Sequence, residues 1–428
     1  MFKSNNTVLF SILMIIITLF LVFYLSKRYK LSKKQLMIFT ILVLFWSSVS
    51  IIRSYRKPYV ITNVEMGGLG LDVALAAQIA SAYGLISFFL RLPLFIFSDI
   101  LNKKKIFIQF GMILMAIASI LVVFKPSYNT LYISSLSMGV CASMIAIFNV
   151  IFSETFAKDN TTVSVSILAS APLLGEFIAA PIQFLGTYGE YKNFWFLWMS
   201  STVIAIITLI LTFFLKEIEI EKKELTIKKI GVVVKNKAFI FICFIALVQS
   251  YVKFSTSGTN MLAYGKNIEM SSLLLAYSDA IFAIFQLISS VLVGTYFIKK
   301  IKVERTLQLG ILFSMLFFII AINTNNTIIV FLAYAFNGLG YGLIYTSLIS
   351  IALEYFDSSY RNISMGIFQA FFSAGIFWGD YIHKWLGNLN LGILNIDNSK
   401  NMFLVAFIVS IIGLILCNIN ISIKNKNN

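Results

Sequence analysis

The sequence predicts an all-α, polytopic membrane protein built from two similar halves, and three observations support this fold class. Of its 428 residues, 59% are hydrophobic and only 12% are charged, against roughly 45–50% and about 25% in soluble domains. Apolar runs of about 20 residues, the length that crosses a bilayer as a helix, recur along the whole chain. The third observation is a long internal repeat.

The repeat relates the segment that begins at Ile151 to the segment that begins at Ile351. Seven identical pairs are each separated by 200 positions: Ile151 and Ile351, Glu154 and Glu354, Phe156 and Phe356, Ser164 and Ser364, Ile167 and Ile367, Gly175 and Gly375, Phe177 and Phe377. Solenoid and propeller units run only to roughly 20–50 residues, so a repeat of this length indicates a duplicated half-protein. We therefore expect the working site to lie where the halves meet.

The chain begins with an apolar run of spanning length, Val8–Leu25, which is followed by five basic residues up to Lys34. A cleavable signal peptide would have a shorter apolar core and a small-residue cleavage site. We expect residues 1–34 to form an extra N-terminal transmembrane helix and a basic cytoplasmic linker, for which a plain anchor is the simplest role.

Twelve further spans are expected, in two groups of six. An N-terminal six-helix bundle, residues 35–215, holds spans at about 36–56, 72–99, 105–124, 128–155, 161–187 and 194–215. Residues 216–237 are the most charged segment and are expected to form a solvated cytoplasmic linker. A C-terminal six-helix bundle, residues 238–428, holds spans at about 238–258, 271–298, 303–323, 327–355, 361–386 and 402–422.

Glycines in the tenth of these spans predict close helix packing. Gly338, Gly340 and Gly342 resemble a nucleotide fingerprint only in their spacing, because no strand precedes them. Small residues at helix interfaces instead let two backbones approach each other in a membrane.

The net charge of +16 is explained by topology. If Lys34 is cytoplasmic and the spans alternate, 23 of the 34 Lys and Arg residues fall in cytoplasmic segments, eight outside and three within spans. This asymmetry follows the positive-inside rule. It predicts a multi-pass cell-membrane protein whose core N- and C-termini are cytoplasmic and whose extreme N-terminus is outside, and it gives no reason to expect nucleic acid.

Metal, disulfide and cofactor chemistry is not predicted. Cys141, Cys243 and Cys417 lie in apolar spans, and His383 is the single histidine, which supports neither a metal site nor a disulfide framework. No nucleotide loop or nucleophile–base pair is visible. We expect no cofactor and no enzymatic activity.

The link between the second and third core spans carries a signature, with Asp99 in the acidic position and Lys103 and Lys104 as the closing basic pair. It resembles the loop motif G-x-x-x-D-R/K-x-G-R/K-R/K of the major facilitator superfamily of transporters, although Phe95 and Asn102 replace its glycines. Two six-helix halves related by a repeat are also the arrangement of that superfamily. The resemblance implies that Asp99, Lys103 and Lys104 latch neighbouring helices in one conformation; a solvated turn is the alternative.

Three cations lie inside predicted spans, namely Arg53, Arg91 and Lys253. Their placement resembles that in the organophosphate:phosphate antiporters of the same superfamily. The resemblance implies that these cations bind a phosphorylated metabolite, which the transporter exchanges for phosphate. The span-five histidine of the glycerol-phosphate members is absent, and Glu176 lies nearby.

These cations would cost roughly 2.5–3.5 kcal/mol each at the bilayer centre, so they must face protein, water or a ligand. Arg53 and Lys253 should oppose each other across a cavity, and an anion between them would relieve their repulsion. The alternative is internal pairing, because Glu176, Asp279 and Asp380 also lie within spans. These carboxylates are candidates for proton coupling or gating.

We therefore expect a monomeric secondary transporter that works by alternating access on a small organic anion. A proton-coupled transporter of a zwitterionic or neutral solute, such as an amino acid or nucleoside, and a drug-type exporter remain alternatives. A membrane receptor or scaffold is the alternative outside transport, but it does not explain a 200-residue repeat with paired buried cations.

Overall fold

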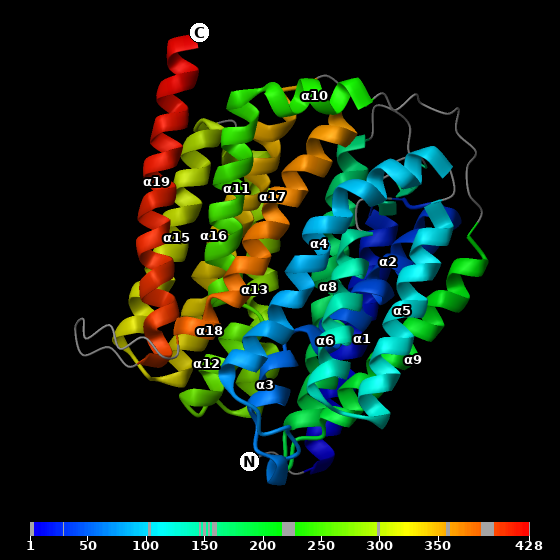
Figure 1. Cartoon of the computed structure of the whole chain (residues 1–428). Helices are drawn as coiled ribbons and strands as arrows, with labels where there is room; N and C mark the ends of the chain where they lie inside the picture. Colours follow the sequence, from blue (N-terminus) through cyan, green and yellow to red (C-terminus); the bar gives the residue numbers. More distant parts are fainter. Residues whose placement is uncertain are drawn as a thin grey trace.

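The fold was analysed in a computed structural model of the whole chain (Figure 1). The structure describes residues 4–28, 30–101, 104–144, 147–148, 151–152, 155, 161–215, 227–297, 300–356, 360–386 and 398–427. In these residues the regular structure is helical, with no strand. The all-α prediction is confirmed.

The first-half helices follow the predicted spans closely. They are α1 (Ser4–Arg28), α2 (Lys33–Arg53), α3 (Arg56–Ile61), α4 (Val73–Leu101), α5 (Lys104–Phe124), α6 (Tyr128–Ser143), α8 (Thr161–Thr187) and α9 (Phe194–Phe213), with a 3-10 turn at Val64–Met66. The span expected at 128–155 is helical as α6 to Ser143, and its later part is only partly among the described residues.

The remaining helices belong to the linker and the second half. They are α10 (Ile227–Lys235), α11 (Lys237–Thr256), α12 (Thr259–Asn267), α13 (Ser272–Leu292), α15 (Val303–Asn323), α16 (Thr327–Glu354), α17 (Arg361–Tyr381), α18 (His383–Leu386) and α19 (Asn401–Asn427), with a π-turn at Val293–Phe297 and a 3-10 turn at Asn398–Lys400. The linker was expected to be solvated. Its described part forms α10, in which Val233 is fully buried.

Polar residues between the apolar runs fix where helices begin. The side chains of Ser32, Ser127, Asn193, Asn236 and Asn326 each accept a hydrogen bond from the first turn of the helix that follows. A side-chain oxygen at this position satisfies backbone N–H groups that have no partner within the helix. Short polar links can therefore connect helices that are otherwise apolar.

Within the described part of the chain, nine helices are long and apolar enough to cross a membrane. The first of them joins α2 and α3, and another joins α11 and α12. Both breaks lie at the ends of the spans predicted at about 36–56 and 238–258, so α3 and α12 extend the helical structure beyond those predictions. The second is permitted by Gly258, whose φ of 58° lies in the left-handed region that glycine adopts without strain.

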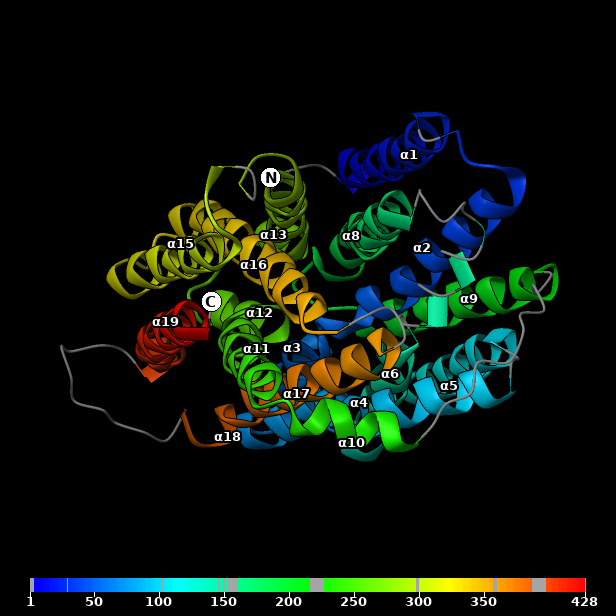
Figure 2. The ribbon, with the colours of Figure 1, turned by 90° about the horizontal axis from the view of Figure 1, so that it is seen from above.

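The two halves lie side by side and meet along two pairs of helices (Figure 2). α4 packs against α17, and α8 packs against α13. The approach of α4 to α17 is close: a Cβ on Gly84 would lie 2.3 Å from the backbone nitrogen of Phe377. The halves also touch at one end, where α3 meets α12. We call it the α3/α12 end.

The predicted packing role of the tenth-span glycines is confirmed. A Cβ on Gly338 or on Gly342 would lie 2.4 Å from a backbone oxygen of α13, and one on Gly340 would lie 2.5 Å from the oxygen of Gly310 in α15. α16 therefore packs tightly against both neighbours because it carries no side chain at these points.

The extra N-terminal helix packs on the outside of the first half, against α8 (Figure 2). The buried Ser11 hydroxyl donates to the carbonyl of Pro181, at 3.4 Å. Pro181 lies inside α8, so the Ser11 hydroxyl bonds to the backbone of α8 at a helical proline.

Candidate functional site

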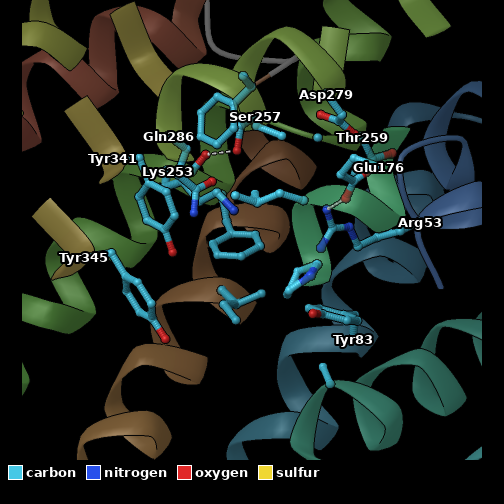
Figure 3. A pocket seen from close by; sticks show the side chains of 18 of the residues that line it. Arg53, Tyr83, Glu176, Lys253, Ser257, Thr259, Asp279, Gln286, Tyr341 and Tyr345 are labelled. Carbon is cyan, nitrogen blue, oxygen red and sulfur yellow. Dashed lines mark hydrogen bonds and ion pairs between the residues drawn. The ribbon is translucent and has the colours of Figure 1, made fainter. Parts of the chain in front are cut away.

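A central cavity of about 170 Å³ lies between the halves and is lined by helices of both. Six of the residues singled out from the sequence line it: Arg53, Arg91 and Glu176 from the first half, and Lys253, Asp279 and Asp380 from the second. Figure 3 shows several of them directed into one space. The structure thus brings together three cations and three carboxylates that lie far apart in the sequence.

Arg53 and Glu176 form an ion pair on the first-half wall. The Nη2 of Arg53 lies 2.6 Å from the Oε1 of Glu176, and the Ser50 hydroxyl donates to the same oxygen at 2.8 Å (Figure 3). The two charged side chains are 20% and 8% exposed. One of the internal pairs foreseen as an alternative is therefore formed, and the Arg53 charge is already compensated.

Lys253 has a different environment, made of aromatic rings. Its Nζ lies 4.1 Å from the ring centre of Phe254, 4.5 Å from that of Tyr341 and 5.5 Å from that of Phe282. Within the described part of the chain, this ammonium group has no hydrogen-bond acceptor and no carboxylate within salt-bridge distance. Ring faces stabilise a cation by roughly 0.5–2 kcal/mol, which leaves its three N–H donors available.

Two more donors, on residues that line the central cavity, have no partner among the described residues. Arg91 donates through Nη1 to the side-chain and backbone oxygens of Gln369 on α17, but its buried Nε has no partner among the described residues. The same holds for the indole nitrogen of Trp46. Buried donors normally find a partner, so these two positions and Lys253 together favour a ligand that accepts hydrogen bonds.

The carboxylates of the second half point at polar groups where the two halves meet. Asp279 accepts a hydrogen bond from the Ser54 hydroxyl in the break between α2 and α3. Asp380, only 2% exposed, accepts from the Asn260 amide at 2.9 Å, and its Oδ2 lies 4.0 Å from Arg56. Both carboxylates thus link the halves next to the central cavity.

Arg56 and Lys57 were missed by the sequence analysis, which counted them among the residues outside the membrane. They are 3% and 2% exposed within α3. Arg56 donates to the Ala80 carbonyl at 2.7 Å, and Lys57 donates through Nζ to Asn260 of the other half. A short polar stretch after an apolar run is typical of a loop. The packing of α3 on α4 and α12 buries it.

Other aromatic and polar side chains of the predicted spans are placed as follows. Trp46, Tyr83, Tyr341 and Gln369 line the central cavity, whereas the buried Asn337 does not. The Nε2 of His383 lies 2.8 Å from the Ser255 carbonyl oxygen, away from that cavity. Asn149 lies outside the described residues.

The loop signature is described only in part. Asp99 lies near the end of α4, but its side chain is not among those described, and Lys103 lies outside the described residues. Lys104 begins α5 and is 8% exposed. The latch remains a prediction. In the described part of the chain, no group of three His, Cys, Asp or Glu residues could hold a metal ion.

Comparison with solved structures shows what the fold is similar to. A POT family transporter in complex with 5-aminolevulinic acid has a TM-score of 0.72 at 12% identity, over 91% of this chain and 96% of that one. The nucleoside transporter NupG has a TM-score of 0.66 at 13% identity, over 91% and 99%. A bacterial homolog of the human lysosomal transporter Spinster, in an inward-facing and occupied conformation, has a TM-score of 0.69 at 10% identity, over 90% and 96%.

A search of curated protein sequences gives no match. The sequence model of the Major Facilitator Superfamily, in contrast, matches residues 57–380 and, in a second match, residues 243–423. The first match alone spans more than half of the chain. The chain therefore belongs to the Major Facilitator Superfamily.

Proposed function

We propose that this protein is a secondary transporter that moves a small organic anion through the central cavity by alternating access. The observation that carries the proposal is a set of donors that have no acceptor among the described residues: the ammonium group of Lys253, the Nε of Arg91 and the indole nitrogen of Trp46. A carboxylate or phosphoryl group accepts several charge-assisted hydrogen bonds, each worth about 1.5–3 kcal/mol.

The proposed binding mode differs from a clamp between Arg53 and Lys253. Arg53 is already paired with Glu176, so the anion binds to Lys253 and Arg91. Arg53 contributes to transport mainly through its ion pair with Glu176. Protonation of Glu176 would remove its charge and release Arg53 toward the cavity. This gives a route by which a proton gradient could be coupled to substrate movement.

A zwitterionic substrate is the second candidate, and Asp279 is the observation that favours it. This carboxylate lines the same central cavity as Lys253. A solute with an ammonium group near Asp279 and a carboxylate near Lys253 would satisfy both. One of the structural neighbours holds 5-aminolevulinic acid, which carries both kinds of group.

A thermal-shift screen of the purified protein tests the proposal. Glycerol phosphate, a hexose phosphate, 5-aminolevulinic acid, a dipeptide and uridine would be compared in the wild type and in Lys253→Met. We expect compounds that bear a carboxylate or phosphoryl group to raise the melting temperature of the wild type only. Stabilisation by uridine alone, retained in Lys253→Met, would overturn the anionic substrate.

A further inference from the structure

A second cavity lies between the halves at the α3/α12 end, and it shares no lining residue with the central one. Its volume is about 170 Å³, which is ample for a small hydrated anion, because one water needs only about 10–15 Å³ by the same measure. Two lysines line it, Lys192 from the first half and Lys266 from the second. We call it the seam cavity.

The two lysines reach across the seam in opposite directions. Lys192, between α8 and α9, donates to the carbonyls of Thr187 at 2.9 Å and Gly189 at 2.6 Å, and to the Ser272 hydroxyl of the other half at 3.2 Å. Lys266, in α12, donates to the Thr62 hydroxyl of the first half at 2.7 Å. Each lysine therefore links its own half to the other.

Among the described residues, neither lysine of the seam cavity has a carboxylate within salt-bridge distance. The acceptors of both lysines are neutral carbonyl and hydroxyl oxygens, and none of the residues that line the cavity is an Asp or Glu. Glu190 is in the same loop as Lys192, but it is exposed and does not line the cavity. Both lysines line the same cavity, so their like charges repel each other. Within the described residues, only one of the three N–H donors of Lys266 has an acceptor.

Two helix N-termini add to this positive potential. α9 begins at Phe194 and α13 begins at Ser272, and both residues line the seam cavity. The N-terminal end of a long helix carries a partial positive charge of roughly half an elementary charge, which favours anions in its first turn. Partial burial also lowers the pKa of Lys192, against the attraction of Glu190, and a nearby anion would stabilise its charged form.

We propose that the seam cavity binds a small oxyanion, of the phosphate or sulfate class, between Lys192 and Lys266, and that this anion holds the halves closed at the α3/α12 end. The two lysines come from different halves, so they can share one anion only when the halves are together. A ligand that binds one of two arrangements shifts the population toward it. At a concentration of 100 times its Kd, the anion would favour the closed arrangement by about 100-fold.

The oxyanion proposal rests on the proposed function only in that the two halves move relative to each other. The seam cavity itself is separate from the proposed substrate site in the central cavity. Inorganic phosphate is the probe, titrated against the melting temperature of the full chain in a chloride-free buffer. We expect stabilisation in the wild type, at least tenfold weaker apparent affinity in Lys192→Gln and Lys266→Gln, and near-wild-type affinity in Lys192→Arg and Lys266→Arg. Lys125→Gln, at an exposed lysine of the α5–α6 loop, is the control that should change nothing.

Lys253→Met separates the two sites. Phosphate stabilisation that survives in Lys253→Met but disappears in Lys266→Gln supports the seam cavity. Stabilisation lost only in Lys253→Met would assign phosphate to the central cavity and overturn this proposal while supporting the proposed function. No stabilisation of the wild type by phosphate or sulfate would also overturn it.

Distance measurement tests the closing effect itself. Spin labels at Asn129→Cys and Asn325→Cys, both exposed and on different halves, would report the separation of the halves; the native Cys141, Cys243 and Cys417 are buried. We expect phosphate to increase the shorter-distance population in the wild type and to leave Lys266→Gln unchanged. A distance distribution that phosphate does not alter in the wild type would contradict the closing role.

Discussion

Arg53 on α2 and Glu176 on α8 form a 2.6 Å ion pair on the wall of the central cavity, although 123 residues separate them. The pair compensates the cation that the sequence suggested as the main anion ligand. Lys253, held among aromatic rings with no carboxylate partner in the described part of the chain, is left as the free charge. This division between a paired and an unpaired cation leads to the predictions that follow.

Glu176→Gln should separate coupling from binding. Glutamine still offers Arg53 an amide oxygen but no negative charge, and breaking a buried pair typically lowers the free energy of unfolding by about 3 kcal/mol. We expect a lower melting temperature and uptake into proteoliposomes that no longer depends on a pH gradient, while exchange between two substrates continues. Uptake that retains its full pH-gradient dependence in Glu176→Gln would show that the pair is only structural.

Lys253→Met should weaken anion binding without destabilising the fold. The substitution removes a half-buried charge that has no carboxylate partner among the described residues, so the free energy of unfolding should stay the same or rise. Loss of one charge-assisted bond of about 1.5–3 kcal/mol corresponds to about 10- to 150-fold weaker affinity, measurable by titration calorimetry.

Lys384→Met is the matched control, because Lys384 also lies over an aromatic ring, 5.6 Å from the centre of Tyr381, but does not line the central cavity. Its substrate affinity should equal that of the wild type. Equal losses in both variants would mean that Lys253 has no special role.

Lys57→Met should open the α3/α12 end. Its ammonium group donates to Asn260 of the other half, and both residues are buried. Removing a hydrogen bond to a charged group shifts the balance between closed and open arrangements by about tenfold or more. A cysteine at Ser257, which is 5% exposed and lines the central cavity, should react about ten times faster with a water-soluble maleimide added from that end. An unchanged rate would exclude Lys57 from closure.

Gly84→Ala should disrupt the α4–α17 interface. The added Cβ would lie 2.3 Å from the backbone nitrogen of Phe377, and a backbone cannot move aside as a flexible side chain can. We expect transport to fall at least tenfold and the melting temperature to drop. Gly231→Ala, in α10 with nothing within 4 Å of the new Cβ, should instead be neutral or stabilising by up to about 1 kcal/mol. A wild-type rate in Gly84→Ala would show that the helices do not need this close approach.

The sequence was sufficient for the architecture because apolar length and charge are local signals. Arg53, Lys253 and Glu176 could be singled out because a charged residue inside an apolar run is unusual. The structure places all three around one cavity. The pairing of Arg53 with Glu176 depends on how α2 packs on α8, which no local pattern encodes.

The α3/α12 end shows more clearly what the sequence alone does not predict. Arg56 and Lys57 follow an apolar run and precede Pro58, a pattern typical of a loop, yet both are buried in α3. Arg56 donates to Ala80 of α4, and Lys57 donates to Asn260 of the other half. The seam cavity was likewise not foreseen, since Lys192 and Lys266 come from links on different halves. Contacts between halves depend on the arrangement of the bundles, and single runs of sequence carry little information about it.

Uptake into proteoliposomes that contain only this protein tests the central claim most directly. The vesicles would be loaded with the unlabelled compound that gave the largest thermal shift, and entry of the labelled compound would be followed without ATP. The account predicts exchange of a compound that bears a carboxylate or phosphoryl group, and at least tenfold slower exchange in folded Lys253→Met at low substrate concentration. Exchange of an uncharged solute at equal rates in wild type and Lys253→Met, or no exchange of any compound without ATP, would contradict it.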